Sequence, residues 1–331
     1  MDKAINDKKL FRIQLIAVFV GLILMVAKFF TYSVTHSNTV LTDALESIIN
    51  VMAGSFALYS LHISSKPQDY DHPYGHGKVE FISAGLEGIM ILIAGALIIV
   101  QAVITFVHPH SLQKLNLGLL VIIGSGLLNF IMGLSLKRTG EKHSSLTLEA
   151  DGQHLLTDAY SALGFAIGIA LIIFTGWLFL DNIVAIVFGI IIIQTGIKLI
   201  RKSLGGMMDE ADERIDESII AHLVAHRKGE WIDFHNLRVI QYGSKLHVDC
   251  HLTLPWYFTL EQAHKEIDEI VGIINKEYFT EVEFFIHGDP CVPRSCPICM
   301  IGDCKVRQAP FVKKVEWTLE NVRLNKKHGL E

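Results

Sequence analysis

The stretch that decides the fold is FISAGLEGIMILIAGALIIVQAVITFV, residues 81–107, in which Glu87 is the one ionisable side chain. A helix of this length can cross the hydrocarbon core of a bilayer, which takes about 20 apolar residues. Similar apolar runs lie on both sides of it, at approximately residues 11–32, 39–63, 115–136, 146–175 and 177–199. Six such runs in succession exceed what a soluble core needs, so we predict six transmembrane helices.

The composition of the whole chain supports a membrane protein. Of 331 residues, 50% are hydrophobic and 19% are charged, whereas about a quarter are charged in soluble domains. The net charge of -5 gives no basic balance that would indicate nucleic acid. Lys and Arg gather before the first run, in the second and fourth connections and after the sixth run. By the positive-inside rule we expect a multi-pass protein of the cell (plasma or inner) membrane with both termini in the cytoplasm.

The composition changes near Gly205, and the segment after this residue is typical of a small soluble domain. We expect a transmembrane domain over residues 1–205, a cytosolic domain over 206–290 and a cysteine-containing tail over 291–331. Helical periodicity over 213–226 precedes two strands (231–241 and 245–254), a helix (259–278) and a third strand (281–287). Thr259 and Gln262 form a predicted capping box at the start of the second helix. This α-β-β-α-β order predicts a ferredoxin-like, metallochaperone-like α+β layer with helices on one face of a small sheet. We expect the basic segment after residue 305 to be loosely ordered.

Polar side chains inside two of the predicted spans indicate an ion site. Glu46 and Asn50 are four residues apart in the second run, and His154 and Asp158 are four apart in the fifth, so each pair shares one face of its helix. Facing each other, the four can surround a divalent cation. Imidazole with carboxylates suits Zn, Fe, Co or Mn better than Cu(I). The alternative is an interhelical hydrogen-bond cluster without metal, and we interpret Glu87 as a packing residue.

Between about residues 11 and 291 the sequence resembles the cation diffusion facilitator family of metal–proton antiporters. The resemblance rests on His154-x-x-x-Asp158, on the loop DYDHPYGHGKVE at residues 69–80, and on IHGDP at residues 286–290. It implies that Glu46, Asn50, His154 and Asp158 form the transport site. Many relatives have Asp or His at the first of these positions and Asp at the second. Glu46 and Asn50 depart from that pattern, which bears on the choice of metal.

The resemblance also implies sites outside the membrane. A secondary metal site on the loop would use Asp69, His72 and His76, and the alternative is a solvated loop with glycine turns. A charge contact between Lys78 and Asp209 would join the two domains near the dimer interface. Some members bind a pair of metal ions at the dimer interface of the cytosolic domain, and the matching positions here are His235, His251, His264, His287 and Asp289.

The tail contains Cys291, Cys296, Cys299 and Cys304, spaced C-x4-C-x2-C-x4-C. Four thiolates around a central C-x-x-C can hold one tetrahedral zinc ion. A reducing cytosol argues against disulfides. The spacing is not a standard zinc-finger pattern, so free thiols are the alternative. We expect the fifth cysteine, Cys250, to be a buried strand residue.

Together these features predict a homodimeric, secondary-active efflux transporter that exchanges a divalent transition metal for protons. Zn and Fe(II) are the leading substrates, Co, Mn and Cd are further candidates, and a zinc ion can also serve a structural role. The partners are then a second copy of the chain, metal ions, protons and the lipid bilayer, with no nucleic acid. The chain has no H-E-x-x-H pattern and no Gly-rich phosphate loop, so we expect no enzyme. The alternatives are a membrane-embedded metalloenzyme and a metal-sensing membrane protein.

Overall fold

The computed structural model describes residues 2–35, 38–107, 115–175, 179–243, 245–277 and 282–329. The chain divides into two units, Met1–Met208 and Asp209–Glu331. We call the first the helical unit and the second the C-terminal unit, and each is described by itself.

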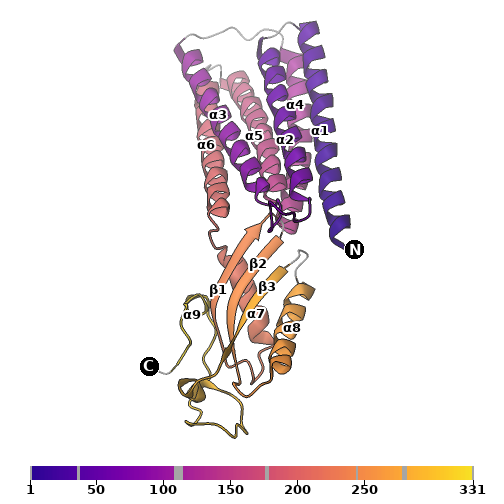
Figure 1. The fold of residues 1–331 in the computed structure, drawn as a ribbon. Helices are drawn as coiled ribbons and strands as arrows, with labels where there is room; N and C mark the ends of the chain where they lie inside the picture. The colour runs from indigo at the N-terminus through magenta and orange to yellow at the C-terminus, as the bar shows by residue number, and fades with distance from the viewer. Residues whose placement is uncertain are drawn as a thin grey trace. The chain divides into compact units, whose positions relative to one another are not determined.

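Long helices build the helical unit (Figure 1). Among the described residues there are six: α1 (Asp2–Thr35), α2 (Asn38–Ser64), α3 (Val79–Val107), α4 (Leu115–His143), α5 (Leu146–Thr175) and α6 (Phe179–Met207). The prediction of six helices is therefore confirmed. Helices α4 and α6 continue past their apolar runs by about two turns, into segments that contain Lys and Arg.

The helices pair closely, α3 with α6 and α4 with α5. Glycine permits this approach. A Cβ atom on Gly88 of α3 would lie 3.0 Å from the carbonyl oxygen of Gly196 on α6, and one on Gly133 of α4 would lie 2.9 Å from the carbonyl oxygen of Gly152 on α5. Small residues that let backbones touch are typical of helix contacts in membranes, where association depends on close packing.

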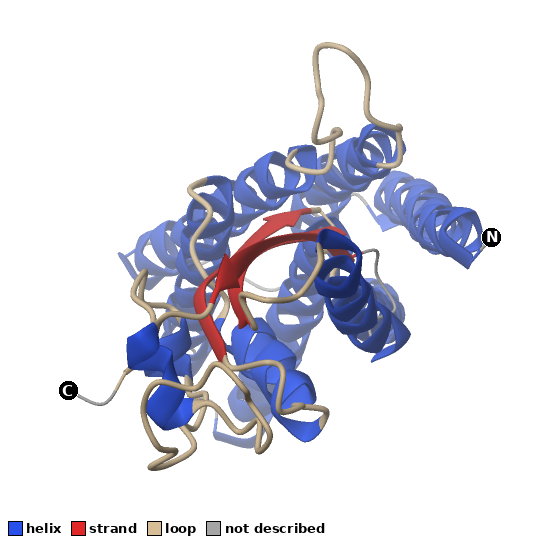
Figure 2. Cartoon of the chain, turned by 60° about the horizontal axis from the view of Figure 1, so that its bottom comes forward, coloured by secondary structure: helices blue, strands red, loops and turns tan. Residues whose placement is uncertain are grey.

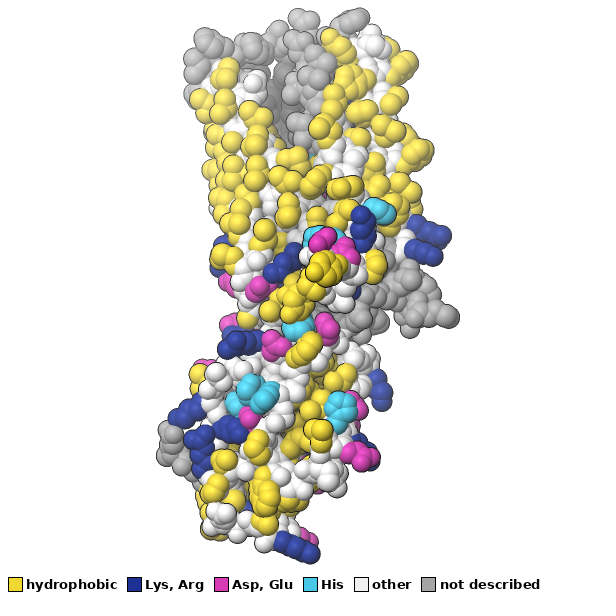
Figure 3. Space-filling model, in the orientation of Figure 1, with side chains coloured by type: hydrophobic (Ala, Val, Ile, Leu, Met, Phe, Trp, Pro, Cys, Tyr) yellow, Lys and Arg dark blue, Asp and Glu magenta, His cyan; other side chains and the backbone are white. Residues whose placement is uncertain are grey.

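The outer surface of the helical unit is apolar. Phe19 and Phe30 on α1 are 62% and 70% exposed, and hydrophobic side chains cover most of the visible surface of this unit in Figure 3. By length and composition, two described stretches could each cross a membrane, Lys8–Val34 and Val79–Ile104, both with a mean hydropathy of 2.4. Such exposure would be unfavourable in water and is expected against lipid.

The C-terminal unit has a three-stranded sheet in the order β1-β2-β3, labelled in Figure 1 and drawn in red in Figure 2. Its elements are α7 (Glu213–Ala225), β1 (Asp233–Tyr242), β2 (Lys245–Leu254), α8 (Leu260–Glu277), β3 (Val282–Pro290), the 3₁₀ helix η1 (Pro293–Ile298) and the short α9 (Leu319–Val322). Strand β2 is antiparallel to β1 and parallel to β3. The predicted capping box is confirmed: Gln262 N donates to Thr259 Oγ1 at 3.2 Å, and Thr259 N donates to Gln262 Oε1 at 2.9 Å.

The two faces of the sheet differ in chemistry. Alternate side chains such as Phe234 and Leu252 join Leu223 of α7 and Ile274 of α8 in one buried apolar cluster, which defines the core face. Because side chains alternate along a strand, the residues between them point to the other face. We call this second face the histidine face, because His235, His247, His251 and His287 lie on it.

The basic segment after residue 305 is built into this core, so the prediction of a loosely ordered segment is wrong. Trp317 is 5% exposed and its ring centroid lies 5.5 Å from that of Phe234. The Arg227 guanidinium stacks over the Trp317 ring at 3.9 Å, and Arg323 Nη2 lies 2.7 Å from Asp216 Oδ2. Hydrophobic periodicity could not predict this, because single anchors and not a periodic face hold the segment.

Candidate metal sites

Helices α2 and α5 bring three of the four predicted transport residues into contact. Asn50 Nδ2 donates to Asp158 Oδ2 at 2.5 Å, and His154 Nε2 lies 3.0 Å from Asn50 Oδ1. Asn50 stands between the other two because its amide offers a donor to the carboxylate and an acceptor to the imidazole. Glu46 lies on α2 one turn before Asn50; its side chain lies outside the part of the chain that the structure describes.

Buried polar groups that the sequence alone did not assign to this site lie close to it. Glu87 on α3 is 1% exposed, and its Oε2 atom lies 3.8 Å from His154 Nδ1, so we expect it to act on this predicted ligand besides packing. Asp151 lies three residues before His154 on the same helix and accepts a hydrogen bond from Gln14 Nε2 of α1 at 2.6 Å. The i, i+3 spacing of Asp151 and His154 was a signal that could have identified Asp151. No sequence spacing relates Gln14 or Glu87 to α5.

The loop between α2 and α3 gathers Asp69, His72 and His76. Asp69 Oδ1 lies 3.1 Å from His72 Nδ1, Asp69 Oδ2 lies 3.4 Å from His76 Nε2, and the two rings are 4.2 Å apart. The backbone N–H of His72 donates to Asp69 Oδ1 at 2.7 Å. This bond, with the two imidazoles, lowers the pKa of Asp69, so its carboxylate is ionised at neutral pH. One ligand atom from each residue lies within 4.8 Å of the others, as binding of one ion would need.

On the histidine face, His235, His251 and Asp289 form a second such cluster. Asp289 Oδ2 lies 3.5 Å from His235 Nε2 and 3.2 Å from His251 Nδ1. Behind them, Asp233 Oδ2 lies 3.2 Å from His235 Nδ1. Burial raises the pKa of Asp233, but contacts with His235 and His328 outweigh burial and hold the pKa below its ordinary value. An ionised carboxylate behind a histidine is a common way to orient a metal ligand.

The other two residues predicted for this cluster differ in position. The His287 ring is 4.8 Å from the His251 ring, with Nε2 3.6 Å from Asp289 Oδ1, at the edge of the group. Within one chain, His264 does not lie in the cluster of His235, His251 and Asp289. Its helix, α8, packs on the core face, opposite the histidine face, and its exposed imidazole lies 3.8 Å from Asp268.

Two further sets of predicted residues lie elsewhere. The four tail cysteines line one cavity of the C-terminal unit. Lys78 belongs to the helical unit and Asp209 to the C-terminal unit, so their charge contact stays a prediction.

Comparison with known proteins shows the family of the chain. Residues 14–208 match the cation efflux transmembrane domain, and residues 212–291 match the cytoplasmic domain of cation efflux proteins. The first match alone covers more than half of the chain. The chain belongs to the cation diffusion facilitator family. This facilitator is therefore a membrane transporter for cation efflux with a cytoplasmic C-terminal domain, and the alternative of a metalloenzyme is wrong.

Individual relatives cover most of the facilitator. It is 32% identical over 259 residues to an uncharacterized transporter of Synechocystis sp., a match that covers 78% of this chain and 83% of the relative. It is 29% identical to the manganese efflux system protein MneP of Bacillus subtilis, over 84% of this chain and 95% of that protein. It is 30% identical to the cation-efflux pump FieF of Shewanella oneidensis, over 75% and 80%. The tail beyond residue 291 lies outside both family matches.

Glu87→Gln in the facilitator is expected to raise the KM for metal flux by about 10- to 100-fold, the usual cost of losing the carboxylate behind a metal-binding histidine. The amide keeps the size of the side chain but replaces the carboxyl group whose Oε2 atom faces His154 Nδ1. The measurement is initial flux against metal concentration in proteoliposomes. The exposed Glu141→Gln on α4 is the control. An unchanged KM would return Glu87 to the role of a packing residue.

Lys327→Gln is expected to tighten zinc binding at His235, His251 and Asp289 by about 2- to 5-fold, the equivalent of a weak ion pair. Lys327 Nζ lies 3.4 Å from Asp289 Oδ1 and donates to the carbonyl oxygen of Pro290 at 3.1 Å. Its ammonium group therefore competes with a cation for the same carboxylate.

The test of Lys327→Gln is zinc titration against a competing chelator. The binding step that is lost in a His251→Ala variant belongs to the site on the histidine face, and the zinc affinity of this step is compared between the parent and Lys327→Gln. Lys313→Gln, in the same tail, is the matched control. Equal zinc affinities for the parent and the Lys327 variant would contradict the expected competition.

Proposed function

We propose that this facilitator is a homodimeric, secondary-active exporter of the cell membrane that exchanges a divalent transition metal for protons at Asn50, His154 and Asp158, together with Glu46. The observation that carries the proposal is the hydrogen-bonded row of Asp158, Asn50 and His154. Asn50 Nδ2 donates to Asp158 Oδ2, so Asn50 Oδ1 is the atom that faces the imidazole. An amide oxygen can only accept a hydrogen bond, so His154 Nε2 carries the proton that it donates to Asn50 Oδ1.

Metal–proton exchange is a consequence of that proton. When the metal-free His154 is protonated at both nitrogens, with Nδ1–H facing Glu87 Oε2, a metal ion that binds Nε2 displaces the Nε2 proton to the solvent and leaves a neutral imidazole with its proton on Nδ1. The same ion would bind the Asp158 carboxylate, which in the metal-free site accepts a hydrogen bond from Asn50 Nδ2. When the site opens to the other side, a proton returning to His154 restores the row and favours release of the metal. Alternating access of this kind is common in secondary transporters.

The ligand set bears on the choice of metal. One imidazole and three oxygen-bearing side chains make a harder site than two imidazoles would, and such a site suits Fe(II), Mn and Co as well as Zn. Zn and Fe(II) are our leading candidates, with Co, Mn and Cd as further substrates. The name of the relative MneP, a manganese efflux system protein, supports keeping Mn among them.

The sites on the loop and on the histidine face are proposed as secondary metal sites outside the transport path. The family of the cytoplasmic domain supports a homodimer, and the proposed contact of Lys78 with Asp209 would lie near its interface. A domain boundary near residue 205 and a tail from residue 291 complete the proposed organisation.

The experiment is metal uptake by sealed proteoliposomes, with Zn, Fe(II), Co, Mn and Cd tested singly and in competition. We expect saturable uptake of more than one of the five ions, with Zn or Fe(II) transported best. Absence of uptake for all five, by protein that is folded and inserted, would contradict the proposal.

A further inference from the structure

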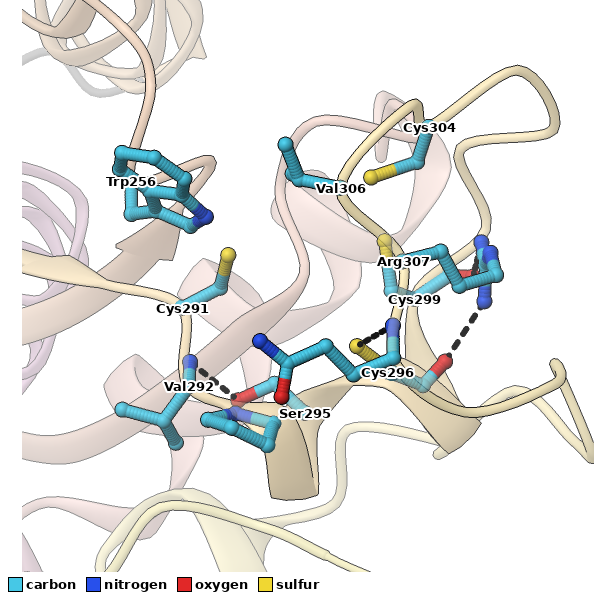
Figure 4. A pocket seen from close by; sticks show the side chains of 11 residues that line it. Trp256, Cys291, Val292, Ser295, Cys296, Cys299, Cys304, Val306 and Arg307 are labelled. Carbon is cyan, nitrogen blue, oxygen red and sulfur yellow. Dashed lines mark hydrogen bonds between the residues drawn. The ribbon is translucent and has the colours of Figure 1, made fainter.

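Trp256, Cys291 and residues of the tail beyond the family matches line a small cavity that contains four cysteines. Cys291 comes directly after β3, Cys296 lies in η1, and Cys299 and Cys304 lie in the loop after η1. Figure 4 shows their side chains around one common space. The cavity measures about 40 Å³, which is room for one ion or one water molecule. No cysteine in the described residues forms a disulfide.

The sulfur atom of Cys296 has a hydrogen-bond donor. A neutral thiol is a weak acceptor, whereas a metal-bound thiolate is a strong one and is usually surrounded by such donors. The donor is the backbone N–H of Gln308, which lies 3.5 Å from Cys296 Sγ. This bond would stabilise a thiolate at Cys296 when an ion is bound.

Arg307 holds the loop of the last cysteines in place. Its guanidinium group donates to the carbonyl oxygens of Cys296 at 2.9 Å, Cys299 at 3.1 Å and Ile301 at 2.5 Å. A divalent ion bound to four thiolates carries a net charge of -2, and the guanidinium group beside it offsets part of that charge. Apolar side chains close the cage from behind, where Cys299 packs with Ile232 and Ile298.

The sulfur atoms stand somewhat too far apart to hold an ion as they are. Among the described residues, no three cysteines of the tail have their sulfur atoms all within 4.8 Å of one another, whereas tetrahedral Zn–S bonds of about 2.3 Å place sulfurs about 3.8 Å apart. Each sulfur can reach other staggered positions by rotation about χ1. We expect such rotations to draw the side chains inward when an ion binds.

We propose that Cys291, Cys296, Cys299 and Cys304 form a structural site for one Zn(II) ion that fastens the tail to the C-terminal unit. Four thiols lose their protons to the buffer as the ion binds, and thiolate sulfur is the ligand that Zn(II) prefers in closed sites. The site lies outside the proposed transport residues and does not depend on their role. Its effect is to hold residues 292–329 in place, including Trp317 in the core and Lys327 beside Asp289.

The first test uses the full-length protein, purified with a reducing agent and loaded with Co(II) in place of Zn(II). A tetrathiolate site gives sulfur-to-cobalt charge-transfer bands in the near ultraviolet, which the histidine and carboxylate sites cannot produce. We expect these bands in the parent and their loss when Zn(II) is added. Absence of the bands in the folded parent would overturn the proposal, whatever the behaviour of any variant.

The second test is elemental analysis of the double variant Cys296→Ser, Cys299→Ser. We expect it to contain about one zinc ion fewer per chain than the parent and to retain metal flux. Cys250→Ala is the matched control, because Cys250 is 1% exposed within β2 and lies outside the cage; its zinc content should equal that of the parent. Equal zinc content in the double variant and the parent would show that these cysteines are free thiols.

Discussion

Asp158→Ala is expected to abolish metal transport while the protein stays folded and dimeric. Asp158 is one of two anionic groups in the proposed site, and its Oδ2 atom is the acceptor for Asn50 Nδ2. Losing a partner behind a metal ligand already costs about 10- to 100-fold in affinity, so losing a ligand should cost more. A buried site with only half of its negative charge is also a poor match for a divalent cation. The measurement is metal flux by purified protein in proteoliposomes.

The control for Asp158→Ala is Asp268→Ala, which removes an exposed carboxylate from α8 and should transport as the parent does. Size-exclusion chromatography shows whether each variant is folded and dimeric. Near-normal Zn and Fe(II) flux by a folded Asp158→Ala protein would contradict the assignment of the transport site.

Asn50→Asp is expected to tighten metal binding by about tenfold or more and to slow release. The new carboxylate adds a third negative charge to the site. In the metal-free state it would face the Asp158 carboxylate, where the parent has a 2.5 Å hydrogen bond from an amide. Two carboxylates this close do not both stay ionised, so the empty site has to take up an extra proton. Turnover should fall, and its dependence on pH should become steeper.

Asn50→Ala is the comparison for this prediction, since it removes the amide without adding a charge and should weaken binding. The same panel of Zn, Fe(II), Co, Mn and Cd shows whether the ranking changes. Unchanged affinity, pH dependence and ranking in Asn50→Asp would mean that Asn50 does not take part in selection.

The spacing of residues along the chain was enough to predict much of the fold and of the proposed transport site. The apolar runs predicted the long helices. The i, i+4 spacing placed His154 and Asp158 on one face of α5, and Asn50 lies on α2. Contact between these two helices is therefore enough to bring the three side chains together. Alternation along the strands separated His235 and His251 from the core. These patterns depend only on the period of the backbone, which the sequence contains directly.

Contacts between distant elements were not predictable in the same way. Gln14, Glu87 and Asp151 reach the proposed site from three helices, and only the position of Asp151 on α5 had a local signal. The place of Trp317 in the core depends on one side chain and not on a periodic face. His264 illustrates the converse, because its helix could cover either face of the sheet and packs on the one opposite His235.

The spacing of the four cysteines left zinc binding and free thiols open. The arrangement of the loops favours zinc binding, because it gathers the four cysteines around one cavity and places Arg307 against the carbonyl oxygens of Cys296 and Cys299. Neither feature has a sequence pattern that could be recognised beforehand.

The most direct test of metal–proton exchange is to record metal uptake and lumenal pH together in sealed proteoliposomes. Exchange predicts that metal entering the lumen drives protons out, so the lumen becomes alkaline in proportion to uptake, and that an acidic lumen accelerates uptake. Both responses should be lost together in Asp158→Ala. Metal uptake by the parent without any change in lumenal pH, or an equal pH change in Asp158→Ala, would contradict exchange at this site.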